Sequence, residues 1–372
     1  MKLNAYTGYT LGLLLTWLGA CGAAEPDMTP ADAGPAAESS EADVDDSEPI
    51  RLSTGSGLAA VWGTSKNDVW AVGGEGTILH FDGKTVTPML SPTTRSLHAI
   101  GGTGPDDVWI AGEEGTTLHW DGFAFTTVAR NENEMLLGIS AVAPDDVWMV
   151  GLVPVDRAGL VRHWDGVSWM DQEVPGSQSL WEVFTFGPND VWFVGTDPNL
   201  HGLVYRGDGQ DFTRLDFHGK ALRSIWGTTA EDVWLLPYDS GAQHWDGSDF
   251  MGEEPAPENG MLGMWGSSRE DVWAVGLKGV IKHFDGTQWT ELEAVTQKTL
   301  WSVWGSSKND VWIAGGEGTL LRWNGKRWRQ LLGPRQRHLI GNRPVAELRS
   351  AVVEITGIEK AIKGVEAFLV PV

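Results

Sequence analysis

The chain has 372 residues, of which 50 are acidic and 27 basic, so its formal net charge is −23. This charge argues against nucleic-acid binding and against electrostatic docking to anionic lipid, because both need clustered lysines and arginines. An apolar content of 41% argues against a wholly disordered chain. The single cysteine excludes an internal disulfide framework and any multi-cysteine zinc site.

The first residues have the layout of a secretory signal. Lys2 precedes an apolar stretch at 11–18 that is too short to span a bilayer. It ends in Leu18-Gly19-Ala20-Cys21, which resembles the lipobox of bacterial lipoproteins. That resemblance implies a signal peptide at 1–20, cleavage before Cys21 and lipidation of that cysteine. An ordinary signal peptide with a chance cysteine is the alternative.

Localisation follows from the same resemblance. We expect an extracytoplasmic, membrane-anchored lipoprotein. Gly22 follows the cysteine, and in the common Gram-negative sorting pattern a residue other than Asp there implies the outer membrane or cell surface. The sequence does not decide between a periplasmic and a surface-facing orientation.

Residues 21–49 form an acidic segment rich in alanine and proline. Positions 22–49 hold nine acidic residues and no lysine or arginine. Such a segment buries too little apolar surface to offset the entropy of ordering it. We predict a disordered, self-repelling tether.

The tripeptide Asp-Val-Trp recurs at intervals of 39, 39, 44, 42, 39 and 39 residues. A period near 40 residues is typical of propellers and solenoids. The copies are Asp68-Val69-Trp70, Asp107-Val108-Trp109, Asp146-Val147-Trp148, Asp190-Val191-Trp192, Asp232-Val233-Trp234, Asp271-Val272-Trp273 and Asp310-Val311-Trp312.

Each unit contains four short runs separated by turn residues. A first run such as 300–304 precedes a second such as 311–314; a third ends in an Asp-Gly turn, as at 281–286, and a fourth begins with an aromatic residue such as Trp289. Second runs such as 108–111 are apolar at successive positions and so need cover on both faces. We predict an all-β fold, a seven-bladed β-propeller of four-stranded blades over residues 50–332.

Most tryptophans, the repeated histidines and the repeated aspartates have a structural interpretation in this frame. We expect the Asp-Val-Trp tryptophans to fill the gap between neighbouring blades, and the aspartates before Val-Trp to form Asx turns. Histidine recurs at one repeat position, replaced twice by arginine, and we expect it to bond within its own blade. The positions are His80, His119, His163, Arg206, His244, His283 and Arg322. The repeated histidines stand on separate blades and would point away from one another, so they could not bind one metal ion together. We therefore predict no metal site and no cofactor, although the sequence leaves open whether a structural calcium ion is bound.

The repeats resemble those of bacterial Asp-box (BNR-like) propellers. The Asp-box places glycine two residues and tryptophan five residues after its aspartate, whereas here the offsets are one and four, as in Asp165-Gly166-Val167-Ser168-Trp169. The repeats are also similar to those of predicted lipoproteins with Asp-Val-Trp-x-x-Gly units. The Gly-His and Trp-Asp signature of WD40 repeats does not fit.

No sequence motif of a known catalytic site is present. The chain lacks Gly-x-Ser-x-Gly, His-Glu-x-x-His and a Walker A loop. Sialidases related to Asp-box propellers need an arginine triad and a tyrosine nucleophile, and the arginines here occupy structural positions. We therefore expect a protein that is not an enzyme, while a carboxylate pair drawn from different blades stays open.

Positions at which the repeats differ are the candidates for binding. Repeats three and four carry insertions between the second and third strands. In a propeller these loops share a face with the loops that lead into each first strand. The second residue of the first strand also varies, from Ala59 in the first repeat to Trp301 in the last. The candidate binding residues are His98, Leu137, Trp181, Arg223, Leu262 and Trp301, with Asp156, Arg157, Asp197, Asn199 and His201 from the insertions. The alternative is that these side chains only fill the mouth of the channel.

Residues 333–372 leave the repeat pattern. Apolar residues there have helix-like spacing interrupted by Gly357, which fits a helix or hairpin docked on the propeller, or an unstructured tail.

The leading functional hypothesis is a non-catalytic, lipid-anchored binding protein that recognises a protein or glycan through one propeller face. We expect a monomer, attached to the membrane through Cys21. One alternative is an outer-membrane assembly scaffold, by architectural analogy with the propeller lipoprotein of the β-barrel assembly machinery. Another is a glycan hydrolase or lyase.

Overall fold

The computed structural model describes residues 56–334 except 157, 175, 239 and 253–259. The predicted signal peptide, the acidic tether and residues 335–372 lie outside this described part.

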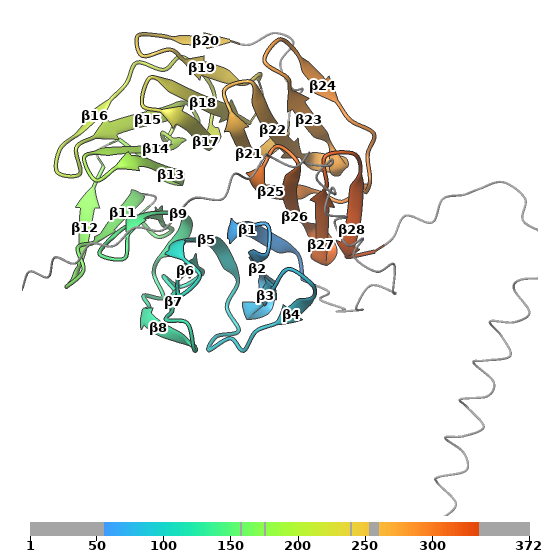
Figure 1. Cartoon of the computed structure of the whole chain (residues 1–372). Coiled ribbons are helices and arrows are strands. Elements are labelled where there is room, and N and C mark those ends of the chain that lie inside the picture. The colour runs from blue at the N-terminus through green and yellow to red at the C-terminus, as the bar shows by residue number, and fades with distance from the viewer. Residues whose placement is uncertain (1–55, 157, 175, 239, 253–259, 335–372) are drawn as a thin grey trace, which may run out of the picture. The chain divides into compact units, whose positions relative to one another are not determined.

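The described residues form seven four-stranded antiparallel sheets, each built from one repeat (Figure 1). Blade 1 holds β1 (Leu58–Ser65), β2 (Asp68–Gly73), β3 (Ile78–Phe81) and β4 (Val86–Pro88). Blade 2 holds β5 (Leu97–Gly104), β6 (Asp107–Gly112), β7 (Thr117–Trp120) and β8 (Phe125–Ala129). Blade 3 holds β9 (Met135–Ala143), β10 (Asp146–Val153), β11 (Ala158–Trp164) and β12 (Trp169–Glu173).

The other four blades repeat this order. Blade 4 holds β13 (Ser179–Gly187), β14 (Asp190–Thr196), β15 (Gly202–Gly207) and β16 (Phe212–Arg214). Blade 5 holds β17 (Leu222–Thr229), β18 (Asp232–Pro237), β19 (Gln243–Trp245) and β20 (Phe250–Gly252). Blade 6 holds β21 (Met261–Ser268), β22 (Asp271–Gly276), β23 (Ile281–Phe284) and β24 (Trp289–Glu291). Blade 7 holds β25 (Leu300–Ser307), β26 (Asp310–Gly315), β27 (Thr319–Trp323) and β28 (Trp328–Leu332).

Three single 3₁₀ turns follow second strands. They are η1 (Gly74–Gly76), η2 (Leu277–Gly279) and η3 (Gly316–Gly318).

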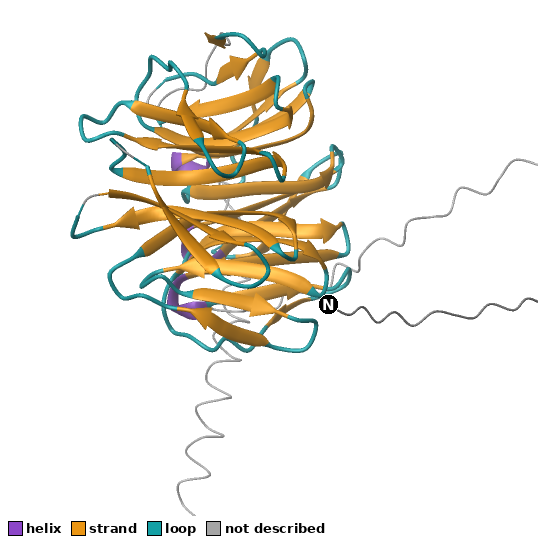
Figure 2. Cartoon of the chain, turned by 90° about the vertical axis from the view of Figure 1, so that its left-hand side faces the viewer, coloured by secondary structure: helices purple, strands orange, loops and turns teal. Residues whose placement is uncertain are grey.

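The predicted seven-bladed propeller is confirmed. The first strand of each blade lies innermost, and these strands contact one another in sequence order around the ring (Figures 1 and 2). The ring closes where β1 packs on β25, and the Val61 amide donates a hydrogen bond to Ser302 Oγ at 3.2 Å there. Because each blade uses one continuous repeat, packing rather than a shared strand joins the first blade to the last.

The hydrophobic cores lie between the blades, as predicted for the tryptophans. The side chain of Trp70 in blade 1 packs in a buried cluster with Ile100, Val108 and Ile110 of blade 2. The side chain of Trp312 in blade 7 packs with Leu58 and other residues of blade 1. Each blade therefore completes its core only against its neighbour.

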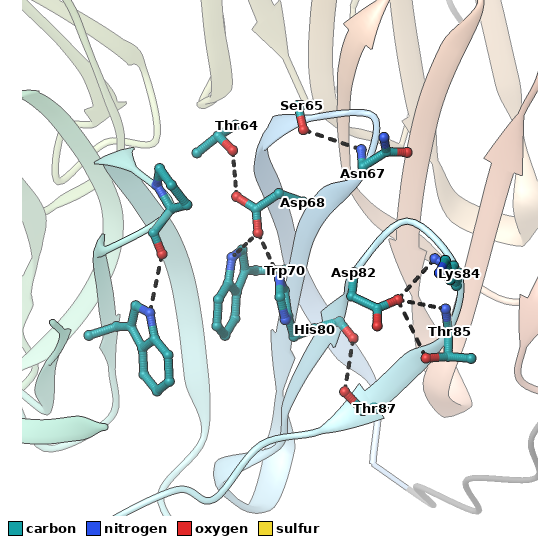
Figure 3. A network of polar contacts seen from close by, with 12 residues as sticks. Thr64, Ser65, Asn67, Asp68, Trp70, His80, Asp82, Lys84, Thr85 and Thr87 are labelled. Atoms are coloured by element: carbon teal, nitrogen blue, oxygen red, sulfur yellow. Dashed lines mark hydrogen bonds and ion pairs between the residues drawn. The ribbon is translucent and has the colours of Figure 1, made fainter. Parts of the chain in front are cut away.

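The aspartate of Asp-Val-Trp has a different role from the one predicted. Instead of forming an Asx turn, Asp68 accepts hydrogen bonds from side chains (Figure 3). Its Oδ1 lies 3.2 Å from Trp70 Nε1 and 2.6 Å from His80 Nε2, and its Oδ2 accepts from the Thr64 hydroxyl. The carboxylate thus links three strands of one blade, because it has lone pairs for several donors at once.

The bond between this aspartate and the histidine or arginine of the third strand recurs around the ring. The distance from histidine Nε2 to aspartate Oδ1 is 2.7 Å in blade 2, 2.8 Å in blade 3, 2.5 Å in blade 5 and 2.6 Å in blade 6. Arg206 and Arg322 donate to Asp190 and Asp310 in blades 4 and 7. The prediction that this position bonds within its own blade is confirmed.

The Asp-Gly turn predicted between the third and fourth strands is confirmed, and its aspartate accepts the backbone bonds of an Asx turn. Asp82 Oδ1 accepts the Lys84 amide at 2.9 Å and the Thr85 amide at 2.8 Å. Gly83 follows Asp82 with a φ of 91°, a left-handed value that favours glycine. The Asx turn therefore belongs to the Asp-Gly pair.

We predict that Trp192→Ala lowers the free energy of unfolding by about 3–5 kcal/mol, the range for a truncated core aromatic residue. Trp192 is 0% exposed and packs with Val204, Leu222 and other residues of the core between blades 4 and 5. Denaturant titration measures the change. Phe123→Ala is the control, because Phe123 is 91% exposed; equal stability of the two variants would contradict the packing role.

Candidate functional site on the bulge face

The loops between second and third strands share one face with the loops that precede the first strands, as predicted. The Gly74 amide donates to the Gly57 carbonyl at 3.0 Å. Gly76, with a φ of 69°, lies so close to the next loop that a Cβ would sit 1.9 Å from the Thr93 carbonyl oxygen. The inserted loops of blades 3 and 4 therefore belong to this face.

The insertion in blade 3 lengthens the hairpin of β10 and β11. Val155, at the tip of this hairpin, is 81% exposed, and Asp156 is exposed beside it. Arg157 lies outside the described residues. The binding role of Asp156 and Arg157 stays a prediction.

The insertion in blade 4 organises itself around Asp197. Asp197 Oδ1 accepts the amides of Asn199 at 2.8 Å and His201 at 2.9 Å, and Oδ2 lies 3.1 Å from His201 Nδ1. Burial acts to raise the pKa of Asp197, but these hydrogen bonds outweigh it and hold the pKa below its ordinary value. The carboxylate of Asp197 is therefore occupied within its loop, while Asn199 and His201 stay exposed.

The variable residue of every inner strand is a β-bulge. In blade 5, Leu222 pairs with Pro237 and Ser224 pairs with Leu236, which leaves Arg223 without a partner across the ladder. The other six blades have the same irregularity. We call these residues the bulge ring: Ala59, His98, Leu137, Trp181, Arg223, Leu262 and Trp301.

Accessibility separates each bulge residue from the residue before it. The residue before each bulge is 0–2% exposed in every blade, whereas each bulge residue is partly accessible and Trp301 is 45% exposed. A bulge re-aims a side chain without breaking the sheet, and bulges are frequent beside functional sites. The bulge ring therefore gives seven side-chain positions that the propeller core does not dictate.

Two of the predicted binding residues, Trp181 and Arg223, contact each other in the bulge ring. The Arg223 guanidinium carbon lies 3.6 Å from the centre of the Trp181 ring, on the neighbouring blade. The same carbon lies 5.3 Å from the Tyr238 ring, so Arg223 contacts two aromatic rings. These distances are within the range of cation–π attraction.

Sequence reasoning missed Tyr238. It follows Pro237, the position where the other six repeats have glycine at or near the end of the second strand. That replacement was the available signal. Glu113 occupies the equivalent position in blade 2, where its charge acts on His98. The bulge residue and the residue after Pro237, or after the equivalent glycine, thus form a pair in both blades.

His98 differs from the other repeated histidines. Its Nε2 is buried and has no hydrogen-bond partner among the described residues. Burial lowers the pKa of His98, although the charge of Glu113 opposes that shift.

The ring is chemically uneven. Blades 3 and 6 place leucine at both positions of this pair, namely Leu137 with Leu152 and Leu262 with Leu277. In blade 7, Trp301 is 45% exposed. Blades 3 to 7 therefore carry an arc of apolar and aromatic bulge residues, with Arg223 as its one cation among the described bulge residues.

Beside this arc, Glu182 replaces a small residue. In other blades the residue after the bulge is small, and the hydroxyl of Ser302 or Ser224 accepts an amide from the next blade, at 3.2 and 3.1 Å. Glu182 Oε2 accepts the Ile225 amide in the same way at 2.7 Å. Burial raises the pKa of Glu182 to about 7, more than its hydrogen bonds to Ser224 and Ile225 lower it.

We predict that Glu182 destabilises the fold as pH rises from about 4.5 to about 7. In that window the carboxyl is ionised in the unfolded chain and protonated in the native one, so the native state loses up to an amount on the order of 3 kcal/mol. Glu182→Gln keeps an acceptor for the Ile225 amide and should remove this loss. Unfolding free energies from pH 4.5 to 8 measure it. Glu231→Gln, at an exposed site, is the control, and parallel pH profiles for wild type and Glu182→Gln would contradict the prediction.

Other chemistry is sparse in the described part of the chain. There, no group of three or more histidine, cysteine, aspartate or glutamate side chains is arranged to hold a metal ion. No helix within the described ranges has the length and apolar character needed to cross a membrane. A hollow between blades 2 and 3 is lined by Asp107 and His119, which bond to each other at 2.7 Å.

Comparisons with known proteins show the fold alone. No family model matches the chain, and no curated protein matches its sequence. Among solved structures, YCF48 from Cyanidioschyzon merolae aligns with a TM-score of 0.59 at 16% identity, over 75% of this chain and 99% of that one. A structure of YCF48 bound to D1 peptide aligns with a TM-score of 0.58 at 17% identity, over 74% of this chain and 96% of that one.

The WD40 propeller domain of Doa1 aligns with a TM-score of 0.60 at 13% identity, over 72% of this chain and 92% of that one. The likeness to YCF48 and WD40 propellers supports the predicted architecture. The Asp-box resemblance and the lipoprotein assignment stay predictions.

Proposed function

We propose that this protein is a non-catalytic propeller that binds a protein segment through the bulge face, the face formed by the bulge ring and the inserted loops. The observation that carries this proposal is the bulge ring itself. Seven equivalent positions are lifted out of the sheet register, and they bear exposed Trp301 and the cation–π pair of Trp181 and Arg223. Tryptophan and arginine are the side chains most enriched at energetic centres of protein interfaces.

A hydrolase is disfavoured by the chemistry of the face. The carboxylate of Asp197 is occupied by its own loop, and Glu134 pairs with Arg162 at 2.8 Å. A glycosidase needs two carboxyl groups facing one bond. Glu182 has a raised pKa, but its acceptor oxygen is already bonded to Ile225.

A protein ligand is favoured over a glycan by the make-up of the arc. Leu137, Leu262 and Leu277 contribute aliphatic surface beside the aromatic groups of the arc. Such a surface suits apolar side chains better than sugar hydroxyls. The structure titled YCF48 bound to D1 peptide is a propeller of similar fold with a peptide ligand, and we extend that mode of binding to this chain.

We also propose that Cys21 anchors the protein to a membrane outside the cytoplasm, as the lipobox resemblance implies. Cys21→Ala should abolish incorporation of radiolabelled palmitate and move the protein from the membrane to the soluble fraction. Growth with labelled fatty acid followed by fractionation measures both. Equal labelling of wild type and variant would refute lipidation at this residue.

We predict that the triple variant Trp181→Ala, Arg223→Ala and Trp301→Ala loses protein partners that wild type captures. Crosslinking in cells that produce the anchored protein, read by mass spectrometry, measures this. Bulge residues lie outside the inter-blade cores, so the variant should keep a cooperative thermal transition.

The matched control is the double variant Phe123→Ala and Arg214→Ala. Both residues are exposed, with Phe123 in the β7–β8 turn at the opposite end of the strands and Arg214 on an outermost strand. Capture of the same partners by wild type and the triple variant would remove the bulge face as a protein-binding site. If wild type binds a glycan on an array and the triple variant does not, the ligand of the bulge face is a glycan instead of a protein.

A further inference from the structure

Arg223 is a partly buried arginine that has no ion-pair partner within the described residues. Other arginines of limited exposure are paired: Arg162 with Glu134 and Asp171, Arg206 with Asp190, and Arg322 with Asp310. For Arg223 the contacts are the Trp181 and Tyr238 rings instead. A desolvated charge without a counter-charge is costly in a protein, and burial correspondingly lowers the pKa of Arg223.

The geometry of this arginine leaves its donors available. At 3.6 Å from the Trp181 centroid, the guanidinium carbon is at stacking distance from the indole. Stacking uses the face of a guanidinium, whereas its five N–H donors point outward in its plane. Contacts to aromatic faces thus hold the group in place without consuming the fork that binds a carboxylate in two parallel hydrogen bonds.

The surroundings limit which anion fits. The bulge residues on either side of the Arg223 and Trp181 pair are Leu262 of blade 6 and Leu137 of blade 3. The net charge of the whole chain is −23, so a strongly acidic ligand would be repelled as it approaches. A single carboxylate flanked by apolar groups satisfies both conditions.

We propose that Arg223 binds one carboxylate of an otherwise uncharged, apolar protein segment that lies across the bulge residues of blades 3 to 7. This inference rests on the proposed protein-binding function and adds the chemistry of the ligand. Trp181 and Tyr238 are positioning residues that hold the guanidinium, and the leucines and Trp301 cover the apolar side chains of the segment. Binding supplies the counter-charge that the described part of the fold does not give Arg223.

The test uses the purified full chain and a displayed library of random 12-residue peptides. Selection on wild type should enrich peptides with apolar residues and a single carboxylate. Enriched sequences are then synthesised with Asp or Glu changed to Asn or Gln, and with free-acid or amidated ends, which separates a side-chain carboxylate from a C-terminal one. Fluorescence polarisation should show that removing the carboxylate weakens binding to wild type by about 10- to 100-fold.

Variants of Arg223 assign the effect. Arg223→Gln should bind acid and amide forms of a peptide equally, and Arg223→Lys should retain only part of the preference because an ammonium lacks the planar fork. Arg214→Gln removes the same charge from an exposed position and should bind like wild type. Thermal melting confirms that each variant is folded.

The outcomes separate this inference from the proposed function. If selected peptides show no carboxylate preference, or if Arg223→Gln keeps it, the carboxylate inference is wrong, while loss of binding in Trp301→Ala would still support a peptide site. If selection enriches no peptide at all, the carboxylate inference and the peptide mode of binding both fail.

Discussion

Every blade of this propeller is apolar on both faces, and the rest of the structure depends on that constraint. Strands such as β26 are buried at all six residues, so a neighbouring blade must cover each side. The tryptophan of each Asp-Val-Trp meets this need by packing into the core of the next blade, as Trp70 does against blade 2. In the last blade, Trp312 packs against blade 1. The ring therefore closes without a shared strand, by packing and by hydrogen bonds such as the one from the Val61 amide to Ser302. Any repeat left at an open end would expose its apolar face to water.

A second, polar constraint holds each blade together internally. Asp68 and its counterparts accept hydrogen bonds from a histidine or arginine in every blade. In most blades a tryptophan and a hydroxyl donate to the same carboxylate. The Asp-Gly turns close the outer hairpins by backbone bonds to a carboxylate. Because these groups are consumed in the frame, the abundant acidic residues of the repeats do not by themselves indicate catalysis. What is left for recognition is the set of positions that neither constraint uses.

The β-bulge makes those positions available. Leu222 stays in the core while Arg223, the next residue, leaves the ladder and reaches the Trp181 ring of the preceding blade. Seven bulges at one level of the ring can therefore change without cost to the cores, and they have diverged from Ala59 to Trp301. Binding and stability are in this way assigned to adjacent residues of the same strand, which explains why the inner strands look monotonous except at one position.

The sequence by itself determined the number of blades, the four strands of each, the bonding of the repeated histidines within their blades and the level at which side chains vary. Those properties follow from local period and turn chemistry, which repeat in every unit. Only the tertiary structure decided that Asp68 is a side-chain acceptor rather than an Asx turn, that Arg223 lies on Trp181, and that Tyr238 completes the contact. These depend on how strands and neighbouring blades approach one another, because residues far apart in sequence meet only after the ring has closed.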